Sequence, residues 1–332
     1  MNYFDYSIAD DITVAVQSLT NNKKAKLIAG GTNLLDLMKE HIVHPEILID
    51  INKLPNTNAI TENSDGGLRL GALVSNADTA YDPLVEKRYP ILSKAILAGA
   101  SPQLRNMATN GGNLLQRTRC SYFYDITMPC NKRLLGSGCS AIGGYNRMNA
   151  ILGTSQDCIA VYPSDMSVAL AVLEATVVVA GINGERYIPF EKFHRLPGNT
   201  PNIDNELAQD EVIIGIDLPP QGFSKNYSYL KIRDRSSYAF ALVSVATAFE
   251  LSGNTITTAR MALGGVAHKP WRSKEAEAFL QNKPANAANF DLVADIILEG
   301  AKGYGHNDFK IPLAKRAIVR NCLTAAKEQA TS

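Results

Sequence analysis

Four cysteines lie close together in the middle of the chain, and their thiols are the side chains best suited to chemistry. They are Cys120, Cys130, Cys139 and Cys158, with nine, eight and eighteen residues between successive members. Four thiolates can bind a metal where an irregular, glycine-bearing backbone brings the sulfurs to one point. Neighbouring cations lower the pKa of a thiol and offset the negative charge of a metal–thiolate site. The nearby cations are Arg117, Arg119, Lys132 and Arg133.

The residue types alone leave three interpretations of these cysteines open. The first is an iron–sulfur cluster, which four sulfurs can bind. The second is a zinc site, although zinc sites usually contain tight C-x₂₋₄-C pairs, which this segment lacks. The third is a set of free thiols or two disulfides; disulfides need an oxidising compartment, and four cysteines allow three pairings. The fifth cysteine, Cys322, lies apart in a helix-like tail and is expected to be an ordinary, partly buried thiol.

Two glycine turns have a composition that suits a bound anion. The stretch "AGGTNLLDL" begins at Ala29 and "ATNGGNLLQ" begins at Ala108, and each combines paired glycines with Thr and Asn before an apolar pair. Paired glycines let the backbone approach a ligand closely and present successive N–H groups to it. Neither stretch has the G-x-G-x-x-G spacing of a dinucleotide fingerprint, so a bare tight turn is the simpler interpretation of each stretch alone. Together they indicate one long ligand held twice, such as a dinucleotide with its pyrophosphate between the turns.

Asp165, Lys231 and the histidines give weaker signals. Asp165 in "PSDMSVAL" fits a helix N-cap. Lys231 alternates with Arg233 and Arg235 along an expected strand, so these cations are either its solvated face or part of a site. The five histidines have no metal-ligand spacing, and we assign none of them a catalytic role.

The elements expected around these motifs are those of an α+β protein. Helix-like and strand-like stretches alternate up to about residue 115. Residues 116–160 show neither period, and loops longer than about 15 residues are uncommon unless they are functional or disordered; the aromatic residues here argue against disorder. A helix and further strands lead to the double proline Pro219–Pro220, which is a natural domain boundary. Beyond it, three strands followed by three helical stretches predict a separate C-terminal α+β domain.

Composition narrows the class of protein. Lys and Arg number 33 against 32 Asp and Glu in 332 residues, which removes the electrostatic case for a nucleic acid or an anionic membrane as partner. No stretch approaches twenty uninterrupted apolar residues, so no transmembrane helix is expected. The opening "MNYFDYSIADD" is acidic and lacks the basic and apolar regions of a signal peptide, so we expect the chain to carry no export signal of its own.

Taken in order, these pieces resemble the flavin-binding subunits of the molybdenum hydroxylases, a family that includes xanthine dehydrogenases, aldehyde oxidoreductases and carbon monoxide dehydrogenase. The resemblance rests on "AGGTNLLDL", "ATNGGNLL", "PSD", "EVIIGIDLP" and K-x-R-x-R-x₅-A-L-V-S-V-A. It implies a PCMH-type, two-subdomain FAD-binding fold over residues 1–220, with subdomains at about 1–55 and 56–220 and an iron–sulfur loop at 116–160. For residues 221–332 it implies a small C-terminal α+β domain of the CO dehydrogenase flavoprotein type, a three-stranded sheet plus helices.

The resemblance also implies which residues contact FAD. The first glycine turn should wrap the pyrophosphate and flank the isoalloxazine, and the second should form another pyrophosphate loop. Asp165 should hydrogen-bond toward the ribityl or ribose region, and Ile213 should line the adenine pocket. Lys231 should lie beside the flavin ring, and Phe240 should touch its face. The implied FAD-binding residues are Leu27, Ile28, Ala29, Gly30, Gly31, Thr32, Asn33, Leu34, Ala108, Thr109, Gly111, Gly112, Asn113, Asp165, Ile213, Lys231 and Phe240.

The cysteine segment departs from most of this family, whose flavin subunits carry no metal. It resembles the subgroup with an additional [4Fe–4S] cluster in this subunit, above all the periplasmic aldehyde oxidoreductases. The likeness lies in the phrase "RTRC-x-YFYD" and in the spacing of the cysteines. The implied cluster ligands are Cys120, Cys130, Cys139 and Cys158.

The function implied by the resemblance is electron transfer within an oxidoreductase complex of the FAD-dependent aldehyde dehydrogenase or oxidase type. A molybdenum–pterin partner would oxidise an aldehyde, and a small [2Fe–2S] partner would pass the electrons to this FAD and on to an external acceptor, in a heterotrimer. The alternatives are a related molybdenum enzyme, such as an aromatic acyl-CoA reductase or a purine hydroxylase, and a non-enzymatic metal-binding scaffold module. The implied location is the periplasm, reached by export in complex with a signal-bearing partner; a cytoplasmic location is the alternative.

Overall fold

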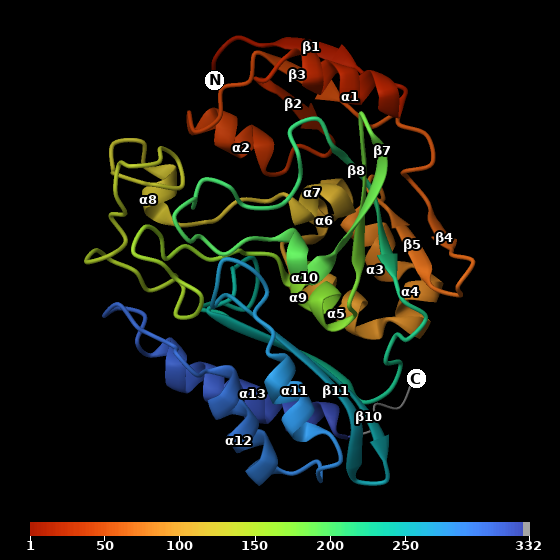
Figure 1. Ribbon diagram of the computed structural model, residues 1–332, viewed down its shortest axis with the longest axis vertical. Coiled ribbons are helices and arrows are strands. Elements are labelled where there is room, and N and C mark those ends of the chain that lie inside the picture. Colours follow the sequence, from red (N-terminus) through yellow and green to blue (C-terminus); the bar gives the residue numbers. More distant parts are fainter. Residues whose placement is uncertain (328–332) are drawn as a thin grey trace.

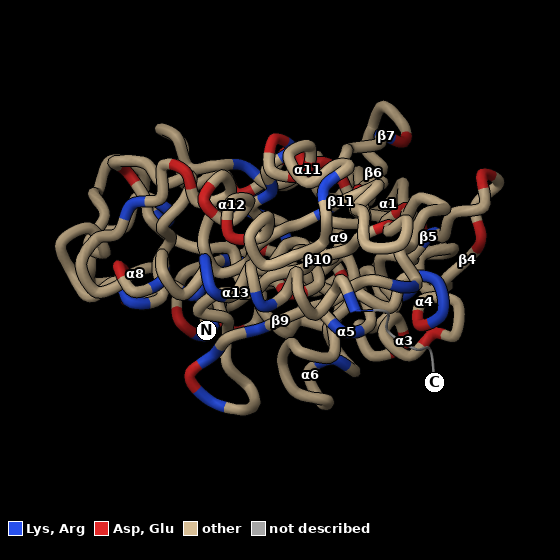
Figure 2. The backbone as a smooth tube through the Cα atoms, turned by 90° about the horizontal axis from the view of Figure 1, so that it is seen from below, with Lys and Arg blue, Asp and Glu red and all other residues tan. Residues whose placement is uncertain are grey.

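The computed structural model describes residues 1–327 and contains three sheets in that range (Figure 1). Each sheet belongs to one stretch of the chain, in the order N-terminal, middle and C-terminal. Lys and Arg are scattered among Asp and Glu over the backbone trace, with neither sign confined to one part of it (Figure 2), and the net charge is +1. No helix within residues 1–327 is long and apolar enough to cross a membrane.

The N-terminal unit is a small parallel sheet with two helices. Its strands β1 (Asp5–Ile8), β2 (Ala25–Ile28) and β3 (Ile47–Asp50) pair in the order β1-β3-β2. Helix α1 (Ile12–Asn21) crosses between the first two strands and buries Ala15, Val16 and Leu19 against the sheet. Helix α2 (Leu34–Lys39) follows the first glycine turn.

The middle unit is built on an antiparallel sheet in the order β4-β5-β8-β6-β7. The strands are β4 (Ile60–Glu62), β5 (Leu68–Gly71), β6 (Thr176–Gly181), β7 (Gly184–Pro189) and β8 (Val212–Leu218). The helices are α3 (Asn76–Tyr81), α4 (Pro83–Arg88), α5 (Pro90–Ala98), α6 (Pro102–Met107), α7 (Asn110–Leu114), α9 (Asp165–Val172) and α10 (Phe190–Phe193). Helix α9 is buried from Met166 to Val172, because it packs against α5 and against β10 and β11 of the C-terminal sheet.

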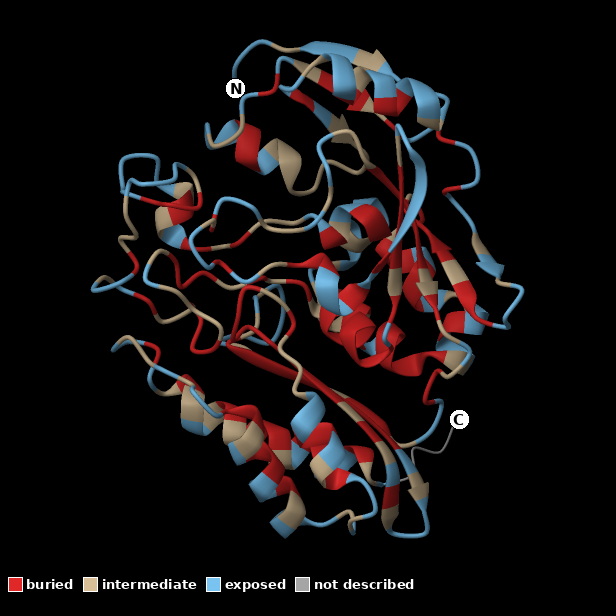
Figure 3. Cartoon of the chain, viewed as in Figure 1, coloured by how far each residue is buried: buried red, intermediate tan, exposed pale blue. Residues whose placement is uncertain are grey.

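The C-terminal unit is a three-stranded antiparallel sheet covered on one face by helices. Strands β9 (Tyr227–Ile232), β10 (Val243–Ser252) and β11 (Thr255–Gly264) pair in chain order. Helices α11 (Lys274–Leu280), α12 (Ala287–Ile297) and α13 (Lys310–Ala325) close an apolar core against it, seen as the buried band of Figure 3. The other face meets the middle unit through three alanines, Ala246, Ala248 and Ala262. The α+β fold with a three-stranded C-terminal sheet is therefore confirmed.

The cysteine segment lies between α7 and α9 and contains one short helix, α8 (Ser121–Tyr124), among turns. Side chains order it in place of regular elements. Asn131 Oδ1 accepts from the backbone N–H groups of Gly136 and Gly138, and the Arg133 guanidinium donates to the carbonyls of Tyr122 and Phe123. The Phe123 ring is fully buried beside the cysteines. The segment is thus a folded loop with a core of its own.

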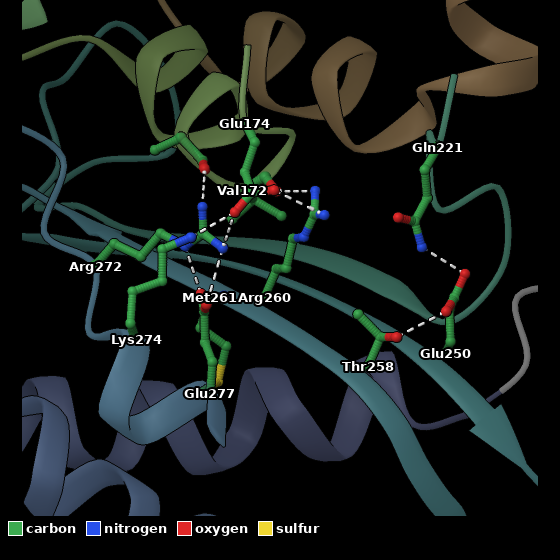
Figure 4. A network of polar contacts seen from close by, with 11 residues as sticks. Val172, Glu174, Gln221, Glu250, Thr258, Arg260, Met261, Arg272, Lys274 and Glu277 are labelled. Carbon is green, nitrogen blue, oxygen red and sulfur yellow. Dashed lines mark hydrogen bonds and ion pairs between the residues drawn. The ribbon is translucent and has the colours of Figure 1, made fainter. Parts of the chain in front are cut away.

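A polar clasp joins the middle and C-terminal units (Figure 4). Glu174, just beyond α9, accepts from Arg260 and Arg272 at 2.8 Å each and from Lys274 at 2.5 Å. Arg272 also pairs with Glu277 at 2.5 Å, and each of these two side chains is only 8% exposed. Three cations from one unit converge on one carboxylate of the other, which fixes their mutual orientation.

Candidate functional site

A cleft of about 720 Å³ runs between the three units. Both glycine turns, the start of α9 and the loop joining β9 to β10 line it. Ten of the predicted FAD-contacting residues line this cleft: Gly30, Gly31, Thr32, Asn33, Ala108, Gly112, Asn113, Asp165, Lys231 and Phe240. Motifs separated by up to 200 residues in the sequence therefore meet at one cavity.

The two glycine turns touch each other directly. A Cβ atom added to Gly30 would lie 1.7 Å from the carbonyl oxygen of Met107, so only glycine permits this approach. Gly31 has a φ of +69°, which a side chain would also strain. Asn33 Oδ1 accepts from the backbone N–H of Arg117 at 2.9 Å and ties the first turn to the cysteine segment. The contact between the turns is what a single ligand held by both would require.

Asp165 and Lys231 form a buried ion pair in the cleft wall. Lys231 Nζ lies 2.8 Å from Asp165 Oδ2, and the two side chains are 4% and 9% exposed. Lys231 also donates to the Ala98 carbonyl at 3.1 Å, and the Tyr229 hydroxyl donates to Asp165 Oδ1 at 2.6 Å. Burial and the nearby Asp165 carboxylate hold the pKa of Tyr229 well above its ordinary value.

The structure corrects the N-cap interpretation of Asp165 and decides between the two alternatives left open for Lys231. Ser164, not Asp165, is the N-cap of α9, because its Oγ accepts from Ser167 N at 3.0 Å. Asp165 is the first helical residue, so its carboxylate is available to Lys231. Lys231 is not on a solvated strand face, since α5 and α9 cover that side of the C-terminal sheet.

The β9–β10 loop contains the predicted Phe240 and two further cleft residues, Arg235 and Tyr238, that the sequence did not reveal. Phe240 is 40% exposed, and the Arg119 guanidinium lies 5.1 Å from its ring centroid. Tyr238 has a φ of +50°, a strained conformation for a non-glycine residue. Arg119, Arg235 and Tyr238 all line the cleft. The composition "RDRSSYAF" reads as continued strand, and no local signal predicts its contact with Arg119.

Seven predicted residues do not line the cleft. They are Leu27, Ile28, Ala29, Leu34, Thr109, Gly111 and Ile213. Thr109 caps α7, with Oγ1 accepting from Gly112 N at 3.2 Å. Ile213, expected in an adenine pocket, is 5% exposed in the core, and a Cβ on Gly111 would lie 3.7 Å from its Cβ. These positions support the lining residues.

The four cysteines face one small cavity beside the cleft. Cys130 and Cys139 pair as an isolated antiparallel bridge, and all four are free thiols. His268 Nε2 lies 3.3 Å from Cys158 Sγ, and Asn149 Nδ2 lies 3.6 Å from Cys120 Sγ. Lys132, only 5% exposed, lines the same cavity and pairs with Asp204.

The electrostatics of the thiols differ from one another. A hydrogen bond from the Cys158 thiol lowers the pKa of Cys139 to about 6, while the same bond raises the pKa of Cys158. Burial raises the pKa of Cys120. Cys139, whose pKa is lowered, is also the least buried of the four.

Whether a metal fits here depends on the kind of site. Within residues 1–327, no group of three or more His, Cys, Asp or Glu side chains is arranged to hold a metal ion. The arrangement of these side chains therefore shows neither a zinc site, which needs four ligands at about 2.3 Å from one centre, nor a cluster, in which each cysteine binds a different iron. The donor set of four thiols with N–H donors and a buried cation suits a cluster, but the cavity measures about 10 Å³, so the thiols would have to turn outward to admit one.

Comparison with known families covers almost the whole chain. Residues 2–221 match the model described as FAD binding domain in molybdopterin dehydrogenase. Residues 228–325 match the CO dehydrogenase flavoprotein C-terminal domain.

Individual relatives agree with these matches. The chain is 48% identical to the aldehyde oxidoreductase FAD-binding subunit PaoB of Escherichia coli over 331 residues, covering 99% of this chain and 100% of that one. It is 27% identical to the glyceraldehyde dehydrogenase medium chain of Sulfolobus acidocaldarius, covering 88% and 85%. Among solved structures, carbon monoxide dehydrogenase from Hydrogenophaga pseudoflava superposes with a TM-score of 0.76 at 27% identity, covering 98% of this chain and 97% of that one.

Proposed function

We propose a function from one premise: this chain belongs to the family of FAD-binding subunits of the molybdenum hydroxylases. Within that family we place it as the FAD- and [4Fe–4S]-containing electron-transfer subunit of a molybdenum-dependent aldehyde oxidoreductase. The observation that carries this is the 48% identity, over essentially the full length of both chains, to an aldehyde oxidoreductase FAD-binding subunit. Identity to the xanthine dehydrogenase subunits of Escherichia coli is 24%, so an aldehyde is favoured over a purine as the substrate of the complex.

FAD would occupy the cleft between the glycine turns and the β9–β10 loop. When bound, it supplies a centre that takes up two electrons and releases them singly or in pairs. The glycine turns present backbone N–H groups for a pyrophosphate. Asp165 pairs with the Lys231 ammonium in the wall and fixes its position beside the ligand. Phe240 and Arg119 offer an aromatic face and a cation at the cleft surface.

The four thiols support the proposal of a cluster in this subunit. They come from widely spaced positions yet line one cavity with Lys132 and Asn149, and the His268 ring nitrogen Nε2 lies 3.3 Å from Cys158 Sγ. Hydrogen bonds to sulfur and nearby positive charge both stabilise thiolate ligands. Cys120 and Asn149 line both the cysteine cavity and the FAD cleft, so the two cofactors would be neighbours.

The partners would be a molybdenum–pterin subunit and a small [2Fe–2S] subunit. Two carbon monoxide dehydrogenase relatives are named as medium chains of their enzymes, which supports assembly with larger and smaller subunits. In this scheme the substrate is oxidised in the partner, and this chain receives the electrons and delivers them to an external acceptor. We further propose that the complex is periplasmic and is exported folded with a signal-bearing partner. Fractionation of cells expressing all subunits separates this from a cytoplasmic location.

The test is anaerobic reduction of the purified complex. Adding an aromatic or aliphatic aldehyde should bleach the flavin absorption of this subunit within the turnover time, while xanthine or an aromatic acyl-CoA should leave it unchanged. Bleaching by xanthine alone would assign the chain to a purine hydroxylase. A purified chain without flavin would favour a scaffold module instead.

A further inference from the structure

Within residues 1–327, the side chains of Lys132, Lys231 and Lys310 are buried, and one of the three has no carboxylate partner. Lys132 pairs with Asp204, and Lys231 pairs with Asp165. Lys310, the first residue of α13, is 0% exposed, and no carboxylate in residues 1–327 pairs with it. An unpaired charge inside a protein is costly. Other groups around Lys310 must therefore offset the cost of burying its charge.

Backbone carbonyls take all three donors of the Lys310 ammonium. Nζ lies 2.5 Å from the carbonyl oxygen of Gly265, 2.8 Å from that of Asn149 and 3.3 Å from that of Met148. Burial, and then the nearby Arg147 guanidinium, lower the pKa of Lys310 to about 7. Three carbonyl dipoles orient the ammonium, but they carry no net negative charge to match it.

The carbonyls that hold Lys310 belong to the wall between the two proposed cofactor sites. Met148, Asn149 and Gly265 line the cleft, and Asn149 also lines the cysteine cavity. The Asn149 side chain reaches Cys120 Sγ at 3.6 Å. The Asn307 side chain holds the same wall by donating to the carbonyls of Asn149 and Ala150 at 3.3 and 3.0 Å. Lys310 is thus one hydrogen bond behind a residue that touches both sites.

We propose that Lys310 is a positioning residue whose ammonium, in its protonated form, offsets the negative charge carried by reduced flavin and by the cysteine-bound cluster at their common wall. This proposal rests on the proposed function, since it needs negatively charged groups on the far side of Asn149. Reduction adds an electron to either group, so a buried cation nearby favours the reduced form. Lys310 should therefore raise both reduction potentials.

The experiment compares variants of the holoprotein by redox titration. Lys310→Gln keeps N–H donors for the carbonyls and removes the charge, whereas Lys310→Met removes both. Asn307→Ala removes neutral hydrogen bonds to the same wall and is the matched control. FAD, iron and acid-labile sulfide are measured first. The flavin potential is then followed by absorbance and the cluster potential by electron paramagnetic resonance.

We expect Lys310→Gln and Lys310→Met to lower both potentials by about 59 mV, which is a tenfold change in a one-electron equilibrium constant. Asn307→Ala should shift them much less. Unchanged potentials in Lys310→Gln, or an equal fall in Asn307→Ala, would overturn the role of the charge. Should Lys310→Met fail to fold, Lys310→Gln alone decides. Wild-type protein without iron would contradict the proposed cluster, yet its flavin titration would still decide the role of Lys310.

Discussion

Removing Lys231 should destabilise the protein strongly, because it would leave Asp165 buried without a cation. In Lys231→Met the carboxylate, 9% exposed, keeps only the Tyr229 hydroxyl as a close partner. Breaking a buried pair in this way costs about 3–5 kcal/mol. The double variant Lys231→Met/Asp165→Leu removes both charges and should recover about 2 kcal/mol of that loss, as coupled neighbours do. The contrast between single and double variants is the signature of a buried pair.

The assay is urea unfolding of the FAD-free chain at pH 7 for the wild type, both single variants and the double variant. Lys315→Ala is the matched control, because Lys315 bridges Asp291 and Asp295 at the surface and its loss should leave the free energy of unfolding within error. Strictly additive losses, or a Lys231→Met variant as stable as wild type, would refute the interpretation of the cleft wall as a desolvated ion pair.

Three further perturbations probe other parts of the structure. Gly30→Ala would drive a methyl group into the Met107 carbonyl, so we expect loss of FAD binding by fluorescence titration, while Gly66→Ala in an open turn should retain it. Burial lowers the pKa of His194 from 6.5 to about 4, so the unfolded state binds more protons between these values and stability falls as pH decreases. Lowering the pH from 7 to 5 should cost about 2 kcal/mol through this residue, and His194→Gln should lose that part of the pH dependence in urea unfolding. Glu174→Gln should lower the free energy of unfolding by about 1–2 kcal/mol. The loss is modest because the Glu174 carboxylate is 36% exposed and Arg272 still pairs with Glu277. A melting temperature equal to that of the wild type would contradict the clasp.

Local patterns predicted those features that depend on neighbours in sequence. Alternation of apolar residues predicted the three C-terminal strands, and the repeated glycine composition predicted two turns serving one ligand, which the structure brings into contact at Gly30. The order of motifs supplied the family resemblance, which the comparisons confirm.

Features that depend on distant packing could not be predicted in this way. Lys231 alternates with two arginines, and only the covering of β9 by α5 and α9 decides that it is buried. Ser164 and Asp165 are both residue types that favour an N-cap, so the sequence alone does not decide between them. In the folded protein Ser164 caps α9 and the Asp165 carboxylate pairs with Lys231, which is 66 positions away. Ile213 sits in a strand that contacts the second glycine turn, so its place in the core depends on a pairing between residues about 100 apart. The contacts of Lys310 likewise join residues more than 40 positions apart.

The central claim is that one chain holds both FAD and a four-iron cluster. The most direct test is an absorption spectrum of the anaerobically purified protein with iron, acid-labile sulfide and FAD analysis, beside a variant in which Cys130 and Cys139 are both replaced by serine. The account predicts flavin absorption over a broad iron–sulfur shoulder, about four irons and four sulfides per FAD, and a variant that keeps flavin but loses iron. A wild-type chain with flavin and no iron under these conditions would contradict the cluster, and a colourless chain would contradict the account as a whole.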